Sequence, residues 1–313
     1  MKILRVVTDL LPDIKLPKRV GRPFVYSPKV VICCFLVMVA KRLSKRGLYA
    51  FLKNESDPVS KAVRLTIPFP DQSIPARRTF DRRLSSCHFH VQLYLLEGAY
   101  FLAKRNLIGL SRLALDNRMF QAMGAIWHRK DQISGIIPKG LRNVDTLAGW
   151  GVSHYRGWIF GHALDVFCTV GKLVIPVLAI ARSLTIRGNT AVKKHAYLLP
   201  KVEKGVVSAD AEYGDQQLGQ YLKVNGRSLH AAKRKNPKDT PKSATYLKRK
   251  TTVEPLYERF LLALSVRGKL PFRGQAAHGF MMIALFLYQV AVIYQVMSKN
   301  PDPLKVTHLI HAL

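Results

Sequence analysis

Acidic residues are scarce in this sequence. It contains 19 Asp and Glu against 50 Lys and Arg, which gives a formal net charge of +31. A folded protein this basic generally binds a polyanion, with nucleic acid as the first candidate and an anionic membrane surface as the second. The basic residues are spread along the chain, so they do not form a terminal localisation tag. Because acids are so few, each Asp or Glu in an apolar setting is a candidate functional residue.

Cysteine is also rare, and its spacing excludes a disulfide framework. The four cysteines include no CxxC pair, which is typical of a protein in a reducing, cytoplasmic compartment. Cys87, His88 and His90 lie close together, but without a second ligand pair we expect no zinc site. The N-terminus has no apolar core of a signal peptide, so we expect none.

Long hydrophobic runs are nearly absent. One uncharged stretch, 279–297, reaches the threshold length of a membrane span. Its Gln and Tyr residues, and the lack of a second such run, favour a buried helix of a large α/β domain. We therefore expect no membrane partner.

The first 110 residues have a helical pattern and are expected to form an all-α domain. Ser27 and Pro28 are typical of a helix start, and the apolar run 30–40 predicts a buried helix. Further helices are expected over 48–53, 76–84 and 90–103. The helix at 76–84 carries basic side chains that we expect to face away from its packed side and to bind DNA, as in the recognition helix of a helix-turn-helix module: Arg77, Arg78, Arg82 and Arg83. The alternative is an ordinary solvated helix with surface arginines.

Residues 111–300 alternate between strand-like and helix-like runs, which predicts an α/β domain followed by a tail, 301–313. Strands are expected at 112–116, 157–167, 173–179, 205–209 and 228–232, with helices around 195–202 and 216–223. Two strands end in an aspartate, Asp116 and Asp210. Working groups of open α/β sheets lie at such strand ends, although turn or capping roles are alternatives.

A third carboxylate, Glu254, is expected in the first turn of a later helix. Thr252 is a plausible N-cap, and Pro255 is compatible with a first turn. Three carboxylates on two strand ends and a helix can hold two divalent ions, and oxygen ligands suit Mg²⁺ or Mn²⁺. Two such ions support in-line phosphoryl transfer. In so basic a protein, this arrangement predicts phosphodiester chemistry on DNA.

At these residues the chain resembles the DDE transposases of bacterial and archaeal insertion sequences. The resemblance covers about 111–297 and depends on four segments: Leu-Ala-Leu-Asp116, Trp127-His128 with Gly-Trp-Ile-Phe-Gly161, Ala-Asp210-Ala-Glu-Tyr-Gly-Asp215, and Arg249-Lys-Thr-Thr-Val-Glu254. In addition, Ile74-Pro75-Ala-Arg-Arg-Thr-Phe resembles part of the family's N-terminal helical domain. It implies a ribonuclease-H-like mixed five-stranded sheet flanked by helices. In that fold the first and fourth strands are neighbours, so Asp116 would lie beside Asp210.

The resemblance also implies an activity and its partners. Asp116, Asp210 and Glu254 would bind two Mg²⁺ ions, for which Mn²⁺ can substitute, and cleave the element's ends before the freed 3′-hydroxyl attacks target DNA. The protein would act as a homodimer on double-stranded DNA, both terminal repeats and target. Tyr246 and Arg249 would contact phosphate near the cut. Beside this site, the basic loop with Lys233, Arg234 and Lys235 is expected to follow the DNA backbone, its alternative being a solvated loop.

Two departures from the family pattern leave alternatives open. Four residues separate Arg249 from Glu254 where relatives usually have three, and Leu261 occupies the position of a usual Lys. Glu258, one turn after Glu254, is therefore kept as a reserve third ligand. The alternative functions are a metal-dependent nuclease without strand transfer and an inactive or repurposed DNA-binding relic.

Overall fold

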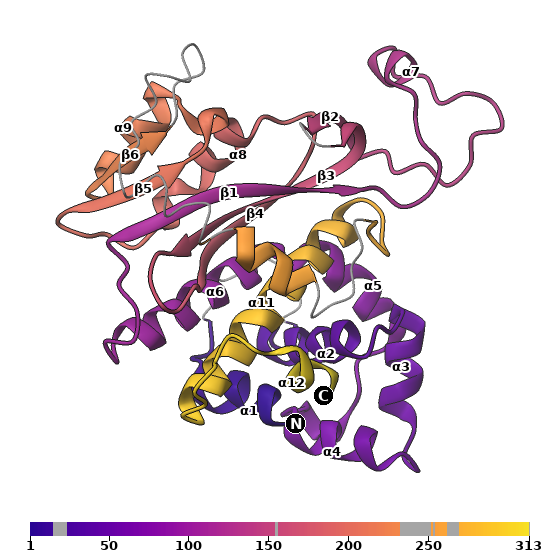
Figure 1. The fold of residues 1–313 in the computed structure, drawn as a ribbon. Coiled ribbons are helices and arrows are strands. Elements are labelled where there is room, and N and C mark those ends of the chain that lie inside the picture. The colour runs from indigo at the N-terminus through magenta and orange to yellow at the C-terminus, as the bar shows by residue number, and fades with distance from the viewer. Residues whose placement is uncertain (15–23, 154–155, 232–251, 253, 262–268, 313) are drawn as a thin grey trace.

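The protein is seen here in a computed structural model that describes residues 1–14, 24–153, 156–231, 252, 254–261 and 269–312. The described chain has a helical body and a curved mixed sheet (Figure 1). The N-terminal part is helical, as predicted, and its elements are α1 (Lys2–Arg5), η1 (Val6–Leu10), α2 (Pro28–Ala40), α3 (Lys45–Lys53), α4 (Pro58–Thr66), η2 (Pro70–Gln72), α5 (Arg77–Ser86) and α6 (His88–Ala103).

Helix α2 shows how this body is built. The Ser27 side chain caps the helix by accepting a hydrogen bond from the Val30 amide at 3.3 Å, and Pro28 occupies the first turn. Almost every side chain of α2 is buried, as its uninterrupted apolar run predicts. The predicted capped and buried helix is therefore confirmed.

The sheet follows in the chain, and its mixed α/β class is confirmed. Its strands and the elements between them are β1 (Arg112–Gln121), α7 (Arg129–Ile133), β2 (Gly149–Ser153), β3 (Gly157–Thr169), β4 (Pro176–Ser183), α8 (Gly188–His195), η3 (Ala196–Leu198), β5 (Gly205–Ala209), η4 (Ala211–Tyr213), α9 (Gln216–Val224) and β6 (Arg227–Ala231). β1 pairs antiparallel with β3 and parallel with β5, which pairs parallel with β6. The predicted first and fourth strands, β1 and β5, are thus neighbours.

Within the described residues the sheet has six strands, whereas five were predicted. The additional strand is β2, which pairs with the beginning of β3, while β4 pairs with the remainder of the same β3 edge. β2 is short and contains Gly149 and Gly151, so it lacks the run of β-branched residues that marks a strand in sequence. The strand depends on pairing with β3, which a local pattern does not reveal.

One helix was predicted at the wrong place. A helix was expected around 195–202, but α8 occupies Gly188–His195 and only the short η3 follows. Gly188 and Asn189 resemble a turn in sequence, yet Ala191 and Val192 bury one side of the helix. Burial of that apolar side outweighs the poor helix propensity of the first turn.

Later in the described chain come the helical segment 254–261 and the helices α11 (Gln275–Met297) and α12 (Thr307–His311). Among the described helices, α11 is long and apolar enough to cross a membrane, but 78% of its most apolar window is buried inside the protein. It packs against α2, α5, α6 and β4. The predicted buried helix is confirmed.

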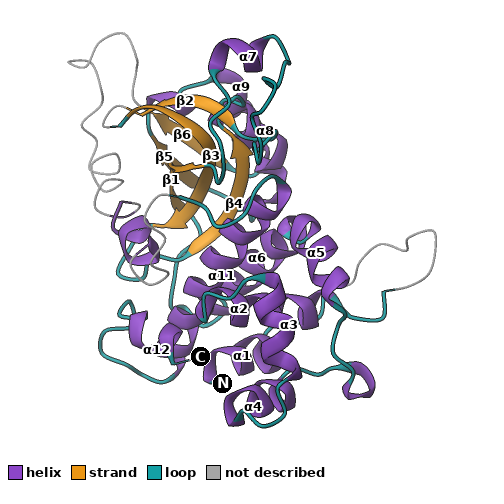
Figure 2. Cartoon of the chain, turned by 90° about the vertical axis from the view of Figure 1, so that its right-hand side faces the viewer, coloured by secondary structure: helices purple, strands orange, loops and turns teal. Residues whose placement is uncertain are grey.

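The helical body and the sheet share one hydrophobic core. A single cluster of buried side chains includes residues of α2, α6, β1, β4 and α11. In Figure 1 the sheet lies between this body and the smaller pair α8 and α9, and Figure 2 shows its strong curvature. The boundaries near residues 110 and 300, the helix-turn-helix arrangement and the ribonuclease-H-like class remain predictions.

Candidate functional site

Asp116 and Asp210 lie at neighbouring positions of two adjacent strands. Leu115 of β1 is in register with Ala209 of β5, the last pair of that parallel ladder, and each aspartate comes next in its chain. β1 itself continues to Gln121, so the predicted strand end at Asp116 is wrong, and what ends at Asp116 is the ladder with β5, while pairing with β3 extends the strand. Asp210 continues the extended backbone, with φ −78° and ψ 172°. Since alternate residues of a strand share a face, the matched register directs both carboxylates to the same face of the sheet. Both side chains are half-buried.

Local hydrogen bonds position both carboxylates. Oδ1 of Asp116 accepts from the Asn117 amide at 2.9 Å. Oδ1 of Asp210 accepts from the Glu212 amide at 2.7 Å and so begins the short turn η4. Asp210 therefore lies at the end of β5, as predicted, and it also has the capping role that was considered as the alternative.

The helical segment that carries Glu254 lies against β1 at Asp116. Tyr257 is 3% exposed, and its hydroxyl lies 3.0 Å from the carbonyl oxygen of Asp116 and 2.8 Å from that of Leu164. Burial, and then the negative charge of Asp116, raise the pKa of Tyr257 well above its ordinary value, so this hydroxyl stays protonated as a donor. Glu254 and Glu258, on the same helical segment, are exposed.

Arg118 lies two residues after Asp116 and therefore on the same face of β1. Burial lowers its pKa, and so does the nearby positive charge of Arg156, while the charges of Glu258 and Asp116 act in the opposite direction. Glu258 is thus near enough to influence the arginine beside Asp116. Even so, no group of three His, Cys, Asp or Glu that could hold a metal is found among the described residues.

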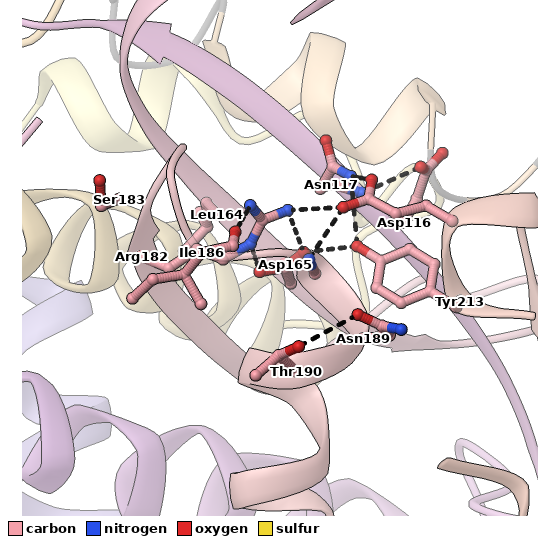
Figure 3. Close-up of polar contacts among 12 residues, drawn as sticks. Asp116, Asn117, Leu164, Asp165, Arg182, Ser183, Ile186, Asn189, Thr190 and Tyr213 are labelled. Atoms are coloured by element: carbon pink, nitrogen blue, oxygen red, sulfur yellow. Dashed lines mark hydrogen bonds and ion pairs between the residues drawn. The ribbon is translucent and has the colours of Figure 1, made fainter. Parts of the chain in front are cut away.

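The opposite face of the sheet holds a buried polar network at the same level (Figure 3). Asp165 is 0% exposed and accepts hydrogen bonds from Nε and Nη2 of Arg182, at 2.7 and 3.1 Å, and from the hydroxyl of Tyr213. Glu212 accepts from Arg182 at 3.2 Å and from the Asn117 side chain at 2.7 Å. Asp165 lies in the middle of β3 and pairs with a basic neighbour, so its role is structural.

The remaining acids of this region are also structural. The Asp215 carboxylate caps α9 by accepting from the Leu218 amide at 2.9 Å, the role that its place between the Tyr-Gly turn and a helical segment predicts. Glu212 lies in η4, the turn that follows Asp210. Neither is a better candidate for chemistry than Asp116 and Asp210.

The predicted DNA-binding arginines of α5 divide into two kinds. Arg77, Arg78 and Arg82 are exposed. Arg83 is only 8% exposed, with its guanidinium 4.0 Å from the ring centroid of Phe24, so the expectation that it faces away from the packed side is wrong. A stacking partner distant in the sequence outweighs its polarity. The other DNA contacts predicted by residue, Lys233, Arg234, Lys235, Tyr246 and Arg249, lie outside the described residues.

Sequence reasoning missed two clusters. Asp145, His162 and His278 form a buried chain of hydrogen bonds, 2.9 Å between Asp145 and His162 and 2.9 Å between the two histidines. The three tryptophans, all between Trp127 and Trp158, gather at the β2–β3 hairpin. Their spacing together with neighbouring arginines was a signal available in the sequence.

Comparisons with known proteins give little further information. No family model matches the chain, and no curated protein matches it. A piggyBac transposase, solved by cryo-EM as a synaptic complex with hairpin DNA, is similar in structure with a TM-score of 0.41 and 11% identity, over 99% of this chain and 76% of that chain. We draw no functional conclusion from a likeness at this level.

Proposed function

We propose that this protein is a DNA transposase of the insertion-sequence type, with a ribonuclease-H-like catalytic sheet in which Asp116, Asp210 and Glu254 are the metal ligands. The observation that carries the proposal is the register of β1 and β5, with Leu115 opposite Ala209. It supports a pair of carboxylates side by side at the end of the β1–β5 ladder, in a protein with net charge +31. The order of antiparallel and parallel pairs around β1 supports the fold assignment.

The donor chemistry of the two aspartates fits Mg²⁺, which prefers carboxylate oxygens. The third carboxylate would come from the helical segment 254–261, and the contact of the Tyr257 hydroxyl with the carbonyl oxygen of Asp116 supports this choice. Glu254 is the proposed ligand and Glu258 its alternative. When bound, two divalent ions activate the attacking oxygen and stabilise the leaving oxygen. The chain's own contribution is to hold the aspartates side by side and to keep this helical segment next to them.

DNA is the proposed substrate and partner. Exposed Arg77, Arg78 and Arg82 on α5 are suited to phosphate or base contacts. The terminal repeats would bind here, and two copies on DNA would bring the element's ends together. Because these contacts neutralise phosphates, binding should weaken steeply with added salt.

The test is cleavage of a duplex that contains the segments flanking the coding sequence, with Mg²⁺ and with EDTA. Asp210→Asn is compared with Asp215→Asn, since both remove one charge from the same turn and both keep a side-chain oxygen to cap the following backbone. We expect Asp210→Asn to bind the duplex and not to cut it, and Asp215→Asn to cut like the wild type. Glu254→Gln and Glu258→Gln then identify the third ligand.

The outcomes separate the alternatives. Products with 3′-hydroxyl ends that join to a second duplex indicate a transposase, and cutting without joining indicates a nuclease. Binding without cutting by any variant indicates a DNA-binding relic. Equal cutting by Asp210→Asn and the wild type would contradict the proposed site.

A further inference from the structure

The β2–β3 hairpin carries an aromatic pocket that the proposed catalytic site does not use. The pocket has a volume of about 270 Å³ and lies where β1 ends. Its described lining contains one charged residue, a base, and no acid: Gln121, Ile126, Trp150, Arg156, Trp158, Ile159 and Phe160. Ligand pockets usually measure roughly 300–1,000 Å³, so this one is suited to a small planar group and not to a duplex.

Two of the three tryptophans are structural. Nε1 of Trp127 donates to the carbonyl oxygen of Ile136 at 2.8 Å, and Nε1 of Trp150 donates to that of Trp127 at 2.7 Å. Trp150 also packs against Phe160, its partner across the β2–β3 pair. These contacts fix the positions of Trp127 and Trp150 next to the third tryptophan, Trp158.

Trp158 differs from the other two because 56% of its surface is exposed. The guanidinium of Arg129, from α7, lies 4.7 Å from its ring centroid, and Trp150 meets it edge to face at 6.5 Å. The orientation of the ring is therefore held by its neighbours. Its indole N–H has no hydrogen-bond partner among the described residues, and tryptophan is highly buried on average. An exposed, oriented tryptophan with basic neighbours is a typical stacking surface for a nucleic acid base.

Basic residues extend from this pocket toward Asp116. Arg156 is exposed and lines the pocket. Arg118 lies on β1 between Asp116 and Gln121, and Gln121 also lines the pocket. Arg118 makes no hydrogen bond or ion pair with the part of the chain that the structure describes. Two neighbouring cations on the path between the pocket and Asp116 are suited to the phosphates of a strand.

From this arrangement we infer that the hairpin pocket binds an unpaired base of DNA, which stacks on Trp158 while Arg156 and Arg118 hold the adjoining phosphates. The inference rests on the proposed function only for the choice of DNA as ligand. It adds a site for a single-stranded or extrahelical nucleotide, separate from the carboxylates.

The test measures binding without metal, so that cleavage plays no part. A short labelled oligothymidylate is titrated in EDTA against wild type, Trp158→Ala, Trp158→Tyr and Tyr221→Ala. Tyr221 on α9 is a matched control because it is 53% exposed. Base stacking on an aromatic side chain accounts for roughly 5- to 150-fold in affinity. We expect a loss of that size for Trp158→Ala, near-complete retention for Trp158→Tyr, and no change for Tyr221→Ala.

An oligonucleotide of the same length with abasic sites distinguishes stacking from charge. It keeps every phosphate and lacks the bases, so Trp158→Ala should bind it as the wild type does. Arg156→Gln should weaken both ligands and reduce the slope of log affinity against log salt by about 0.7. Thermal unfolding of each variant checks that the hairpin still folds.

Equal binding of oligothymidylate by Trp158→Ala and the wild type would overturn the inference. An equal loss of affinity of Trp158→Ala for the base-containing and the abasic ligand would also overturn it. So would unchanged binding by Trp158→Ala together with an altered oligomeric state, because the pocket would then be a contact between two copies of the chain. Asp210→Asn should bind the oligonucleotide like the wild type. The binding result therefore does not depend on whether the protein cleaves DNA, and the cleavage result does not depend on whether the pocket binds a base.

Discussion

Two pairs of aspartates in the sheet region differ in their surroundings. Asp145 and Asp165 are 1% and 0% exposed, and several donors from the protein bind each carboxylate. Asp116 and Asp210 are half-buried at the ends of the β1–β5 ladder. Residue type is the same in both pairs. What differs is access, and we infer that the enclosed pair serves stability, whereas Asp116 and Asp210, the ladder-end pair, are partly open to solvent.

The largest expected effect tests the enclosed pair. Asp165→Ala removes the main partner of Arg182, which is 4% exposed, and leaves a buried cation with incomplete compensation. Breaking such a pair costs about 3–5 kcal/mol. Denaturant unfolding should show this loss in the free energy of unfolding. A loss of stability no larger than that of Asp210→Asn, in the ladder-end pair, would remove the distinction between the two pairs.

The second prediction concerns how acid affects the stability of the buried cluster of Asp145, His162 and His278. Burial, followed by the charge of neighbouring His162, lowers the pKa of His278 from 6.5 to about 3, so the folded protein keeps it neutral. Burial opposes ionisation of Asp145, but hydrogen bonds from His162 and Gly274 lower its pKa overall. Below pH 6.5 the unfolded chain protonates His278 and the folded chain does not. The free energy of unfolding therefore decreases as the pH is lowered from about 6.5 to 3, by roughly 1.4 kcal/mol per pH unit for His278.

His278→Gln isolates that contribution. The variant should unfold with a shallower dependence on pH, by about one proton, across the same window. Exposed His308 provides the control, since His308→Gln should leave the slope unchanged. Equal slopes for wild type and His278→Gln, measured by unfolding at several pH values, would show that the enclosed cluster is not the acid-sensitive part.

The third prediction connects the helical segment 254–261 with the ladder-end pair, Asp116 and Asp210. Tyr257→Phe removes the hydroxyl that contacts the backbone oxygens of Asp116 and Leu164. Loss of this buried donor should cost about 1–2 kcal/mol. If the segment positions the third ligand, cleavage should fall by more than the stability change explains, measured well below the melting temperature. Tyr49→Phe, on a partly buried tyrosine of α3, is the control.

The smallest expected change in stability is that of Asp210→Asn. The amide oxygen can still accept from the Glu212 backbone, so the free energy of unfolding should change by less than about 0.5 kcal/mol. Loss of cleavage without loss of stability would show that Asp210, unlike Asp145 and Asp165, is not needed for the fold. A large destabilisation, seen in the same denaturant titration, would place Asp210 with the structural acids.

The sequence was most informative where one local pattern decides the structure. The β-branched run before Asp210 predicts β5, and the Ser27-Pro28 start predicts α2. The same holds for the cap at Asp215 and for the burial of 279–297. In each case hydrophobic period or capping chemistry is contained within a few neighbouring residues.

The features that were missed depend on partners far apart in the chain. β2 exists through its pairing with β3, and Arg83 is buried because Phe24 stacks on it. Asp145, His162 and His278 come from a loop, a strand and a helix, and no spacing in the sequence connects them. The pairing of Asp116 with Asp210 followed from the family resemblance and not from the residues alone.

Helix α11 has a consequence for how the chain is made. It packs against α2, α5, α6 and β4, all of which a ribosome synthesises earlier. Until residues 275–297 emerge, the apolar faces of those elements have no partner, and the common core stays incomplete. Folding of the body is thus a late, long-range event, and the growing chain exposes aggregation-prone surface for most of its synthesis. A chain that stops before residue 275 should be insoluble or degraded, even though every proposed metal ligand has already been translated.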